Sequence, residues 1–510
     1  MGRTVPGGGV VNGRTDAVPG GGLLALLVGM AAASAALLLW QVFTPEPLRG
    51  FGLTVDRLSA ALTLLVAGVG AVTFHFSRRY LDGDPGRPRF LRVLAFTVSA
   101  AYLLMLATNL LLLFLAWSLT SLGLHRLLTY SAGRSEAVRP ARKKFLISRL
   151  GDIALVAAIL LIWQRYGTLD LPTFLAALGA ASADVPTAVG LLVVVAALTK
   201  SAQVPFHSWL PETMEAPTPV SALMHAGVIN AGGALVLRFA PLIVRVPEAL
   251  LALAVIGTLT AVLGLVAMWA QVKVKRTLAW STVSQMGFMM VQCGVAAFPA
   301  ALLHIVGHGC YKAWSFLRAG TLPAPSRAPL PVAPLRRLIL VAMGVAVSVP
   351  VFVVASSATG YSPLHSPGEL ALTAVLALSV GQVWVAVYGN RARNTADLVT
   401  RTVTALAATA AVPVAAFVLY HGAGQFLAPV LGDLPTPAGP LAWVAATVPV
   451  LALIGLTVFH ALLPVLGRTP AGRRVYVHAL HGFYFGAVAD RIVDGVWGGR
   501  GQPTPEVKGA

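Results

Sequence analysis

The chain has 510 residues, of which 57% are hydrophobic and only 11% are charged. Soluble domains carry about 25% charged residues, so this composition excludes a soluble fold and indicates a polytopic membrane protein. The net charge of +19 does not indicate nucleic-acid binding, because the basic residues lie in short loops between apolar segments, where they orient membrane helices. The two cysteines, Cys293 and Cys310, lie in separate apolar segments, so neither an iron–sulfur cluster nor a disulfide framework is expected.

Apolar stretches long enough to cross a bilayer recur along the whole chain. They predict an all-α polytopic membrane protein with about 14 transmembrane helices, near 23–43, 57–76, 91–107, 110–128, 145–164, 186–204, 218–240, 247–270, 277–294, 299–318, 338–356, 369–389, 402–420 and 441–466. We expect a disordered tail over 1–22, a single transmembrane domain over 23–466 and a C-terminal tail over 467–510. Within that last tail, 475–495 suits an interfacial helix and the final residues suit disorder. The Gly-rich start has no clear cleavage site, so the first apolar stretch is interpreted as a retained helix.

The loop charges alternate with the predicted spans. Loops on one side are basic, with Arg78, Arg79, Arg87, Arg89, Arg92, Arg134, Arg139, Arg142, Lys143, Lys144, Lys273, Lys275, Arg276, Arg318, Arg327, Arg336, Arg337, Arg391, Arg393 and Arg401, whereas the opposite loops hold little beyond Arg49, Arg165 and Arg245. This alternation predicts that both termini are cytoplasmic. Residues 134–148 are interpreted as a basic surface segment, and 168–182 as a short amphipathic helix on the outer face.

One apolar stretch, 198–239, carries an interruption. Lys200 lies inside it with small and polar neighbours, and Pro205 ends or kinks the helix within about a turn. Glu212 and Glu215 follow, either as functional groups or as solvated residues at the membrane surface. An ionisable side chain at membrane depth beside a broken helix predicts an ion-translocating site, with Lys200 as its main residue.

Further ionisable residues lie in neighbouring spans. Arg149 and Asp152 are three residues apart on one helical face, either as a neutralising pair or with Asp152 as the counter-charge of Lys200. His225 is predicted about two turns inside the helix that follows the interruption, as a proton-transfer group or as a buried hydrogen-bonding residue.

A third helix carries a polar stripe. His304, His308 and Lys312 are spaced i, i+4 and i+8, which places them on one face of an otherwise apolar helix. The histidines could bind a metal, but no third ligand is evident, so a proton relay is favoured.

These segments together resemble a known family. The stretches LTKSAQVPFHSWLPETMEAPTPVSALMHAG, HIVGHGCYKAWSFL and KKFLISRLGD are similar to the antiporter-like subunits of respiratory complex I and the Mrp-type cation/proton antiporters, over about residues 50–320. The resemblance implies inverted five-helix repeats, each with a broken helix, in a core extending over about residues 50–420. It also implies proton-transfer roles for Lys200, His225, His304, His308 and Lys312.

The chain departs from the complex I pattern. The family glutamate would fall at about Ser118. A late lysine is missing from the second broken helix, which the resemblance places near 369–389, and we expect no long lateral helix. The variants SLGLHRLLTY and YVHALHGFYFG instead resemble the DabB membrane subunits of two-component inorganic-carbon (CO₂/bicarbonate) accumulation complexes. In that family the partner is DabA, a large zinc-containing subunit resembling β-carbonic anhydrases. The resemblance implies that ion flow, of H⁺ or Na⁺, drives CO₂ hydration in that cytoplasmic partner.

Three functions are therefore compared: the membrane subunit of an inorganic-carbon transporter, a proton-pumping subunit of a complex I-type redox enzyme, and a subunit of a cation/proton antiporter. The departures above favour the first. No catalytic centre, metal site or cofactor is expected in this chain, and zinc is expected in the partner. The predicted translocation residues are Lys200, His225, His304, His308, Lys312, Asp152, Arg149 and Glu212.

Overall fold

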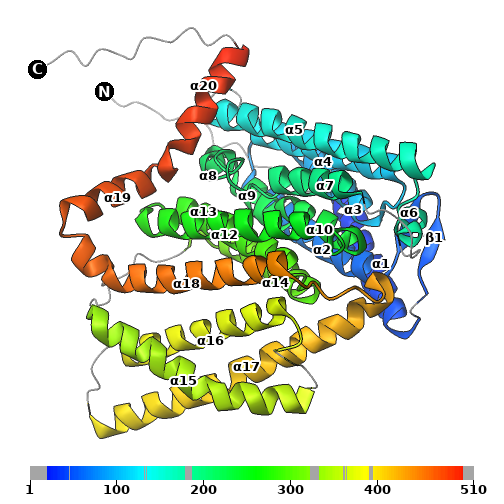
Figure 1. Cartoon of the computed structure of the whole chain (residues 1–510). Helices are drawn as coiled ribbons and strands as arrows, with labels where there is room; N and C mark the ends of the chain where they lie inside the picture. Colours follow the sequence, from blue (N-terminus) through cyan, green and yellow to red (C-terminus); the bar gives the residue numbers. More distant parts are fainter. Residues whose placement is uncertain are drawn as a thin grey trace, which may run out of the picture.

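A computed structural model describes residues 20–44, 46–130, 133, 135–178, 186–321, 332–359, 362, 364–389 and 394–497. It is a bundle of helices running roughly side by side, with short helices and a small hairpin at its ends (Figure 1). The first half contains α1 (Gly21–Phe43), β1 (Leu48–Gly50), β2 (Leu53–Val55), α2 (Arg57–Tyr80), α3 (Arg87–Leu106), α4 (Leu110–Leu128), α5 (Ser135–Tyr166), α6 (Leu171–Ala177) and α7 (Thr187–Lys200). After it come α8 (Trp209–Glu212), α9 (Thr218–Ala226), α10 (Ala231–Arg238) and α11 (Ala240–Ile243).

The second half continues the bundle. Its helices are α12 (Pro247–Ala270), α13 (Val274–Gly294), α14 (Phe298–Leu317), α15 (Pro334–Thr359), α16 (Pro367–Tyr388), α17 (Thr395–Leu431), α18 (Pro440–Leu466), α19 (Pro470–Leu480) and α20 (Phe485–Trp497). Each predicted span falls on a helix, with α9 and α10 together forming one of them. Eleven helical stretches within the described residues are long and apolar enough to cross a membrane, so the all-α polytopic class is confirmed.

The antiparallel hairpin β1–β2, which pairs Leu48 with Val55 and Gly50 with Leu53, was not expected from the sequence. It lies with α6 at the end of the bundle opposite α19 and α20 (Figure 1). Helix α6 matches the first part of the amphipathic helix predicted over 168–182, and residues 179–185 lie outside the described residues.

The interruption after Lys200 is confirmed. Helix α7 ends at Lys200, Ala202 adopts a left-handed conformation with φ +48°, and the Val204–Pro205 peptide bond is cis. A turn, α8 and a 3₁₀ turn over Thr213–Glu215 lead to α9. Pro217 and Pro219 stand at the start of α9, where their missing N–H groups are not needed.

A second break was expected near 369–389 from the family resemblance, but α16 is continuous from Pro367 to Tyr388. The one proline of that helix stands at its first position, which is compatible with an intact helix. The second half of the bundle therefore lacks a break at this place.

The interpretation of 134–148 as a surface segment is wrong for its last part. Helix α5 already begins at Ser135 and runs through Pro140. The side chains of Lys143 and Lys144 are buried, with exposed fractions of 1% and 4%. Both ammonium groups find acceptors inside the protein, described below, which offsets the cost of removing them from water.

The predicted interfacial helix over 475–495 corresponds to α19 and α20, which are separated by a kink at Phe483. The two helices run from the end of α18 across the ends of the other helices to α5 (Figure 1). Most of the predicted N-terminal tail and the last residues, 498–510, lie outside the described residues. The cytoplasmic position of both termini stays a prediction.

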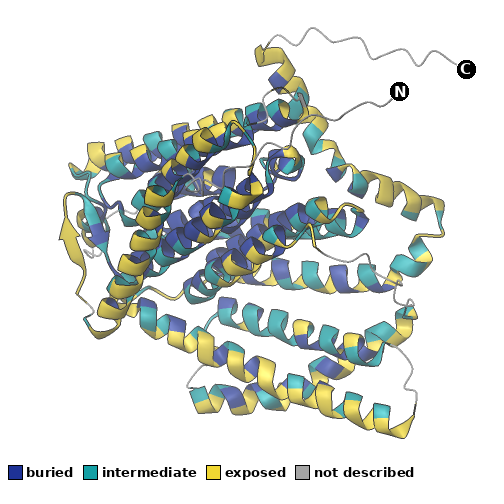
Figure 2. Ribbon diagram, turned by 180° about the vertical axis from the view of Figure 1, so that it is seen from behind, coloured by how far each residue is buried: buried dark blue, intermediate teal, exposed yellow. Residues whose placement is uncertain are grey.

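The most buried part of the bundle is the helix pair α9–α10. The whole of the best apolar window of Thr218–Arg238 is buried, whereas only 22% of the best apolar window of α17 is buried. Figure 2 shows the same contrast, with buried residues concentrated in the first half and exposed ones along α15 and α17. Lys200 and His225 are therefore enclosed by protein, while the outer helices present apolar side chains to lipid.

Candidate functional site

Lys200 is the last residue of α7 and is enclosed by α4 and α5. Its ammonium group donates to the backbone carbonyl of Trp117 at 3.1 Å and lies 4.2 Å from the centre of the Trp117 ring. Close packing of α5 on α7 brings these groups together, since a Cβ at Gly151 would lie only 2.1 Å from Thr199 Oγ1. The charge is stabilised by a carbonyl dipole and by the negative face of an indole ring.

Asp152 is linked to Lys200 through Trp117. Its Oδ1 accepts a hydrogen bond from the indole Nε1–H of Trp117 at 3.0 Å, and its Oδ2 pairs with Arg149 at 2.6 Å. Lys200 and Asp152 form no direct ion pair in the described structure. The Arg149–Asp152 pair therefore neutralises itself locally, and Asp152 is linked to Lys200 only through the indole of Trp117. Its role as the counter-charge of Lys200 stays a prediction.

A second buried lysine, Lys144 of α5, contacts α4 one helical turn beyond Trp117. Lys144 donates to the backbone carbonyl of Ser121 at 2.7 Å and to Ser121 Oγ at 2.6 Å. Ser148 Oγ donates to the carbonyl of Lys144 at 2.7 Å. On α5, residues 144, 148 and 152 therefore form a polar stripe with the same spacing as 304, 308 and 312 on α14.

Glu212 belongs to an ion cluster that joins the interruption to the C-terminal helix. Lys143 pairs with Glu212 and, at 2.9 Å, with Asp490 of α20, and it also donates to the carbonyl of Gly486 at 3.2 Å. Burial raises the pKa of the Glu212 carboxyl, and the Lys143 ammonium opposes that rise. Glu212 is therefore a paired, partly buried acid and not a free surface residue.

The cluster borders a large opening on the side of the basic loops. A cavity of about 840 Å³ is lined there by Glu136, Arg139, Pro140, Pro211, Glu212, Met214, Glu215 and residues 273–276. Charged groups of α5, α8 and the α12–α13 loop thus face one water-accessible space. Glu212, at the edge of this space, pairs with the buried Lys143. The next residue, Lys144, is buried against α4.

His225 on α9 is fully buried and stacks on Phe316 of α14, with ring centres 4.4 Å apart. Neither of its ring nitrogens has a hydrogen-bond partner among the described residues, and Ser221 Oγ and Asn230 Oδ1 on the same segment are also without one. Helices α9 and α14 approach closely because Gly309 has no side chain; a Cβ there would lie 2.8 Å from the Ala226 carbonyl oxygen. This contact brings His225 towards the α14 stripe.

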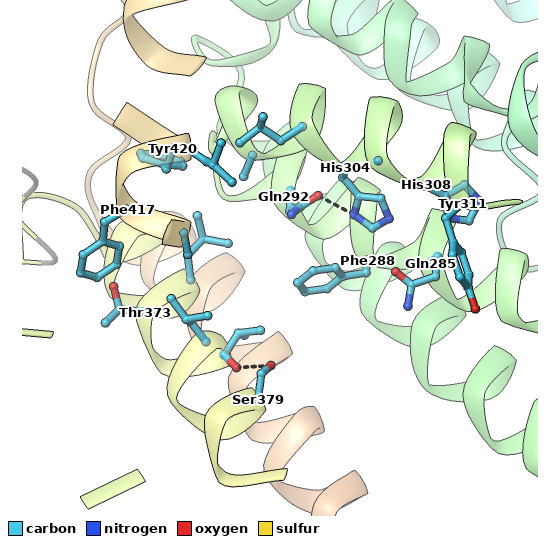
Figure 3. Close-up of a pocket in the computed structure, with 18 of the residues that line it drawn as sticks. Gln285, Phe288, Gln292, His304, His308, Tyr311, Thr373, Ser379, Phe417 and Tyr420 are labelled. Atoms are coloured by element: carbon cyan, nitrogen blue, oxygen red, sulfur yellow. Dashed lines mark hydrogen bonds between the residues drawn. The ribbon is translucent and has the colours of Figure 1, made fainter. Parts of the chain in front are cut away.

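The α14 stripe faces a cavity. His304 Nδ1 is hydrogen-bonded to Gln292 Oε1 at 3.0 Å, and the rings of His304 and His308 are 5.7 Å apart. Lys312 donates to Ser281 Oγ at 2.8 Å and to the Leu278 carbonyl at 3.2 Å. Figure 3 shows His304, His308 and Tyr311 on one side of the space, facing Thr373, Phe417 and Tyr420 across it.

This cavity measures about 750 Å³ and lies between α13–α14 and α16–α17. One wall is polar, with Ser281, Gln285, Gln292, His304, His308 and Lys312, and the opposite wall is largely apolar. The arrangement can hold protons on imidazole and amine groups in a row.

Comparison with known proteins fits this geometry. Residues 107–390, more than half of the chain, match the family described as NADH:quinone oxidoreductase/Mrp antiporter, transmembrane. The chain belongs to this family. Residues 49–91 also match the N-terminal family of NADH-ubiquinone oxidoreductase (complex I) chain 5.

Individual relatives of this antiporter-like family extend the comparison. The chain is 43% identical over 305 residues to the probable inorganic carbon transporter subunit DabB2 of Halothiobacillus neapolitanus, covering 59% of this chain and 55% of that protein. It is 41% identical over 276 residues to DabB1 of the same organism, covering 53% and 49%. It is 38% identical over 289 residues to NADH-quinone oxidoreductase subunit L of Mycobacterium tuberculosis, covering 55% and 46%. The chain thus matches about half the length of these curated relatives.

A solved antiporter structure has the same architecture. The Mrp complex from Dietzia sp. DQ12-45-1b aligns with 93% of this chain and 56% of that chain, with a TM-score of 0.52 and 26% identity. The antiporter-like fold predicted from the family resemblance is therefore confirmed, apart from the second break that the continuous α16 contradicts.

The structure also identifies residues of this antiporter-like chain that sequence reasoning missed, namely Trp117, Lys143, Lys144 and Ser121. The two lysines were assigned to a loop because they end a run of basic residues. The spacing of 144, 148 and 152 was the available signal, since it continues the face of Asp152 into the basic segment.

Proposed function

We propose that this chain is the ion-conducting membrane subunit of an inorganic-carbon transporter. In this proposal protons move through the bundle down their gradient, and the energy drives CO₂ hydration and bicarbonate accumulation in a zinc-containing cytoplasmic partner. The relatives named DabB1 and DabB2 support the assignment of substrate and partner. The chain contributes the pathway, and the zinc chemistry belongs to the partner.

The observation that carries the proposal is the environment of Lys200. An ammonium group is buried at the end of a broken helix, against a carbonyl and an indole ring, with the Arg149–Asp152 pair behind that ring. Ionisable side chains at membrane depth mark ion pathways, because their burial is costly without a role. An amine in such a setting can release and regain a proton when its neighbours shift by small distances.

The other predicted residues extend the pathway towards the second half. The unpaired polar atoms of Ser221, His225 and Asn230 mark a line on α9–α10 where ordered water would satisfy buried groups. Because α9 and α14 are in close contact, the proposed pathway continues from His225 to His308, His304 and Lys312 on α14. Imidazole and amine groups linked by water can pass a proton along this line without moving a bulky ion.

The region beside Lys200 favours a carbon transporter over a redox-driven pump. Ser118 occupies the position where the complex I pattern carries a glutamate, and the buried Lys144 adds a second positive group nearby. Lys200 therefore has a different set of partners from a lysine that faces a glutamate. The similarity to subunit L of Mycobacterium tuberculosis keeps a complex I-type subunit as the second candidate, with an Mrp-type antiporter subunit as the third.

The test is to co-express the chain with its genomic partner in a host that requires high CO₂. Growth in air, carbon uptake abolished by an uncoupler, and a co-purifying zinc protein are expected. A co-purifying flavin or iron–sulfur protein would favour the complex I-type subunit. Sodium-dependent proton release from vesicles without carbon uptake would favour the antiporter.

A further inference from the structure

Lys312 is a buried cation without a matching acid. Its side chain is 1% exposed. It donates to Ser281 Oγ at 2.8 Å and to the Leu278 carbonyl at 3.2 Å, which uses two of the three donors of an ammonium group. Among the described residues, no carboxylate lines the cavity beside it. An anion placed in that cavity would therefore meet both a positive charge and a spare N–H donor.

His308, one helical turn before Lys312 on α14, is a second group with spare hydrogen-bonding capacity. It is 7% exposed, and its Nε2 has no hydrogen-bond partner among the described residues. Both residues line the same cavity, and Figure 3 shows His308 beside Tyr311 on the polar wall. Buried polar atoms are normally paired, so an unpaired nitrogen beside an unpaired charge indicates a place for a polar ligand group.

The opposite wall of the cavity suits a hydrocarbon chain. It is formed by the central parts of α16 and α17, two helices that are long and apolar enough to cross a membrane. Its apolar members are Leu372, Val375, Leu376, Ala416, Phe417 and Leu419. The cavity therefore lies at membrane depth, away from the ends of both helices.

The cavity also reaches the lipid-facing surface of the bundle. Tyr311 and Leu419, which lie on opposite walls, are each 56% exposed. The volume of about 750 Å³ falls within the range of about 300–1,000 Å³ that is typical of small-molecule sites. A ligand dissolved in the bilayer can therefore enter from the side.

We propose that this cavity binds a long-chain fatty acid from the bilayer. The carboxylate lies against the Lys312 ammonium and the His308 ring. The chain lies along the apolar wall of α16 and α17 and leaves through the lateral opening. The site is thus amphipathic in the same way as its ligand, with one charged contact and one apolar surface.

The depth of the cavity selects a fatty acid over other lipids. A phospholipid keeps its phosphate at the membrane surface, because a charge that is not neutralised is costly in hydrocarbon. A carboxylic acid can enter hydrocarbon in its protonated, neutral form. Beside Lys312 the ionised form is favoured, because the ammonium compensates its charge.

Occupation of the site would act on the α14 stripe. A carboxylate beside Lys312 favours the charged form of the amine, and the bound head group displaces water from the polar wall. Proton transfer along the stripe should therefore be slower when the fatty acid is bound. This consequence rests on the proposed function, whereas the binding itself does not.

Binding is tested in proteoliposomes of the full chain with its co-purified partner. The probe is palmitic acid that carries a photoreactive diazirine and an alkyne in its chain, and cross-linked residues are located by mass spectrometry. We expect cross-links in α14, α16 and α17, at residues that line the cavity. Unmodified palmitic acid should suppress them, whereas hexadecanol, which has the same chain without a charge, should not.

The charge is tested by Lys312→Gln, which keeps a donor for Ser281 but removes the positive charge. Cross-linking should fall about tenfold, as expected for the loss of one hydrogen bond to a charged group. Lys312→Arg keeps the charge and should retain the labelling, which separates recognition of the carboxylate from a packing role. Lys275→Gln, at the start of α13 and outside this cavity, is the matched control and should be labelled normally.

The apolar wall is tested by Leu376→Trp, which places a larger side chain in the cavity and changes no charge. Cross-linking should fall severalfold, whereas Leu370→Trp, on the same helix but outside the cavity, should have no effect. This pair tests the site independently of Lys312, and gel filtration shows that all variants are folded.

Three results would overturn the site: equal suppression by palmitic acid and hexadecanol, undiminished labelling of Lys312→Gln or Leu376→Trp, or cross-links confined to helices outside the cavity. Because cross-linking does not depend on ion flow, it separates this inference from the proposed function. A protein that binds palmitic acid but conducts no protons would refute the proposed function and leave the site intact.

Discussion

Lys200 and Lys312 are both buried lysines on helices that face the centre of the bundle, but their surroundings differ. Lys200 meets a carbonyl and an aromatic ring, and an Arg–Asp pair stands behind that ring. Lys312 meets a serine hydroxyl and a carbonyl beside a cavity of about 750 Å³. No carboxylate lines that cavity among the described residues.

The difference teaches how each amine is controlled. Around Lys200 the neighbouring groups are fixed by packing, so small displacements of a few side chains change its electrostatic environment strongly. Around Lys312 the cavity admits polar solvent on one side, which softens the effect of any one neighbour. We therefore expect all-or-none responses to changes at the first site and graded responses at the second.

The largest effect is expected for Lys200→Ala. Proton flux in proteoliposomes should fall to background, because the amine at the helix break is removed while insertion into the membrane is preserved. Lys200→Arg is the matched control, since it keeps the charge but cannot release a proton, and it should also be inactive. Wild-type flux in either variant would remove Lys200 from the pathway.

Trp117→Phe tests whether the hydrogen bond from Trp117 to Asp152 matters for proton flux. The phenyl ring keeps the aromatic face but loses the Nε1–H bond to the carboxylate, a hydrogen bond to a charged group worth about 1.5–3 kcal/mol. We expect a flux decrease of about tenfold or more. Trp163→Phe, on the exposed face of α5, is the control and should conduct normally; equal flux in both variants would contradict the link.

His308→Ala tests the graded response of the second half. The substitution interrupts the His304–His308–Lys312 stripe, but water in the cavity can bridge part of the gap, so flux should fall severalfold without being lost. Initial rates of proton uptake under an imposed membrane potential provide the measurement. Unchanged flux would reduce the stripe to a packing role, and complete loss would show that the second half is as critical as Lys200.

The smallest effect is expected at the C-terminal helix. Asp494→Asn removes an exposed ion pair, in which the Asp494 side chain is 46% exposed and the Arg139 side chain 48%. It should lower the free energy of unfolding by less than about 1 kcal/mol. Asp490→Asn removes a partner of the buried Lys143 and should cost about 1.5–3 kcal/mol. Thermal unfolding of the purified protein in detergent compares the two; equal shifts would contradict the structural role of the Lys143 cluster.

Much of the bundle could be predicted from the sequence, because apolar runs and prolines act locally. The spans, the interruption within about a turn of Lys200 and the i, i+4, i+8 stripe on α14 all follow from local sequence. The resemblance to a family added the inverted repeats. It also led to the expected break near 369–389, which the continuous α16 contradicts.

The partners of the charged residues could not be predicted, because they lie on other helices. Asp152 could be nominated for Lys200, but the indole of Trp117 between them depends on how α4 packs against α5 and α7. Lys144 stands in a run of basic residues, as a solvated loop lysine would. Its burial depends on α5 beginning at Ser135 and packing against α4. The pairing of Asp56 with Arg238 joins positions 182 residues apart, beyond the reach of any local pattern.

Helices α19 and α20 have a mechanical consequence. They lead from α18 back to the N-terminal end of α5. There Asp490 and Asp494 form ion pairs with Arg139 and Lys143. These ion pairs attach α20 to α5 in the first half of the bundle. A displacement of α20 would therefore act on the interruption after Lys200. It would do so through the contacts of Lys143 with Asp490 and Glu212, and not through the lipid.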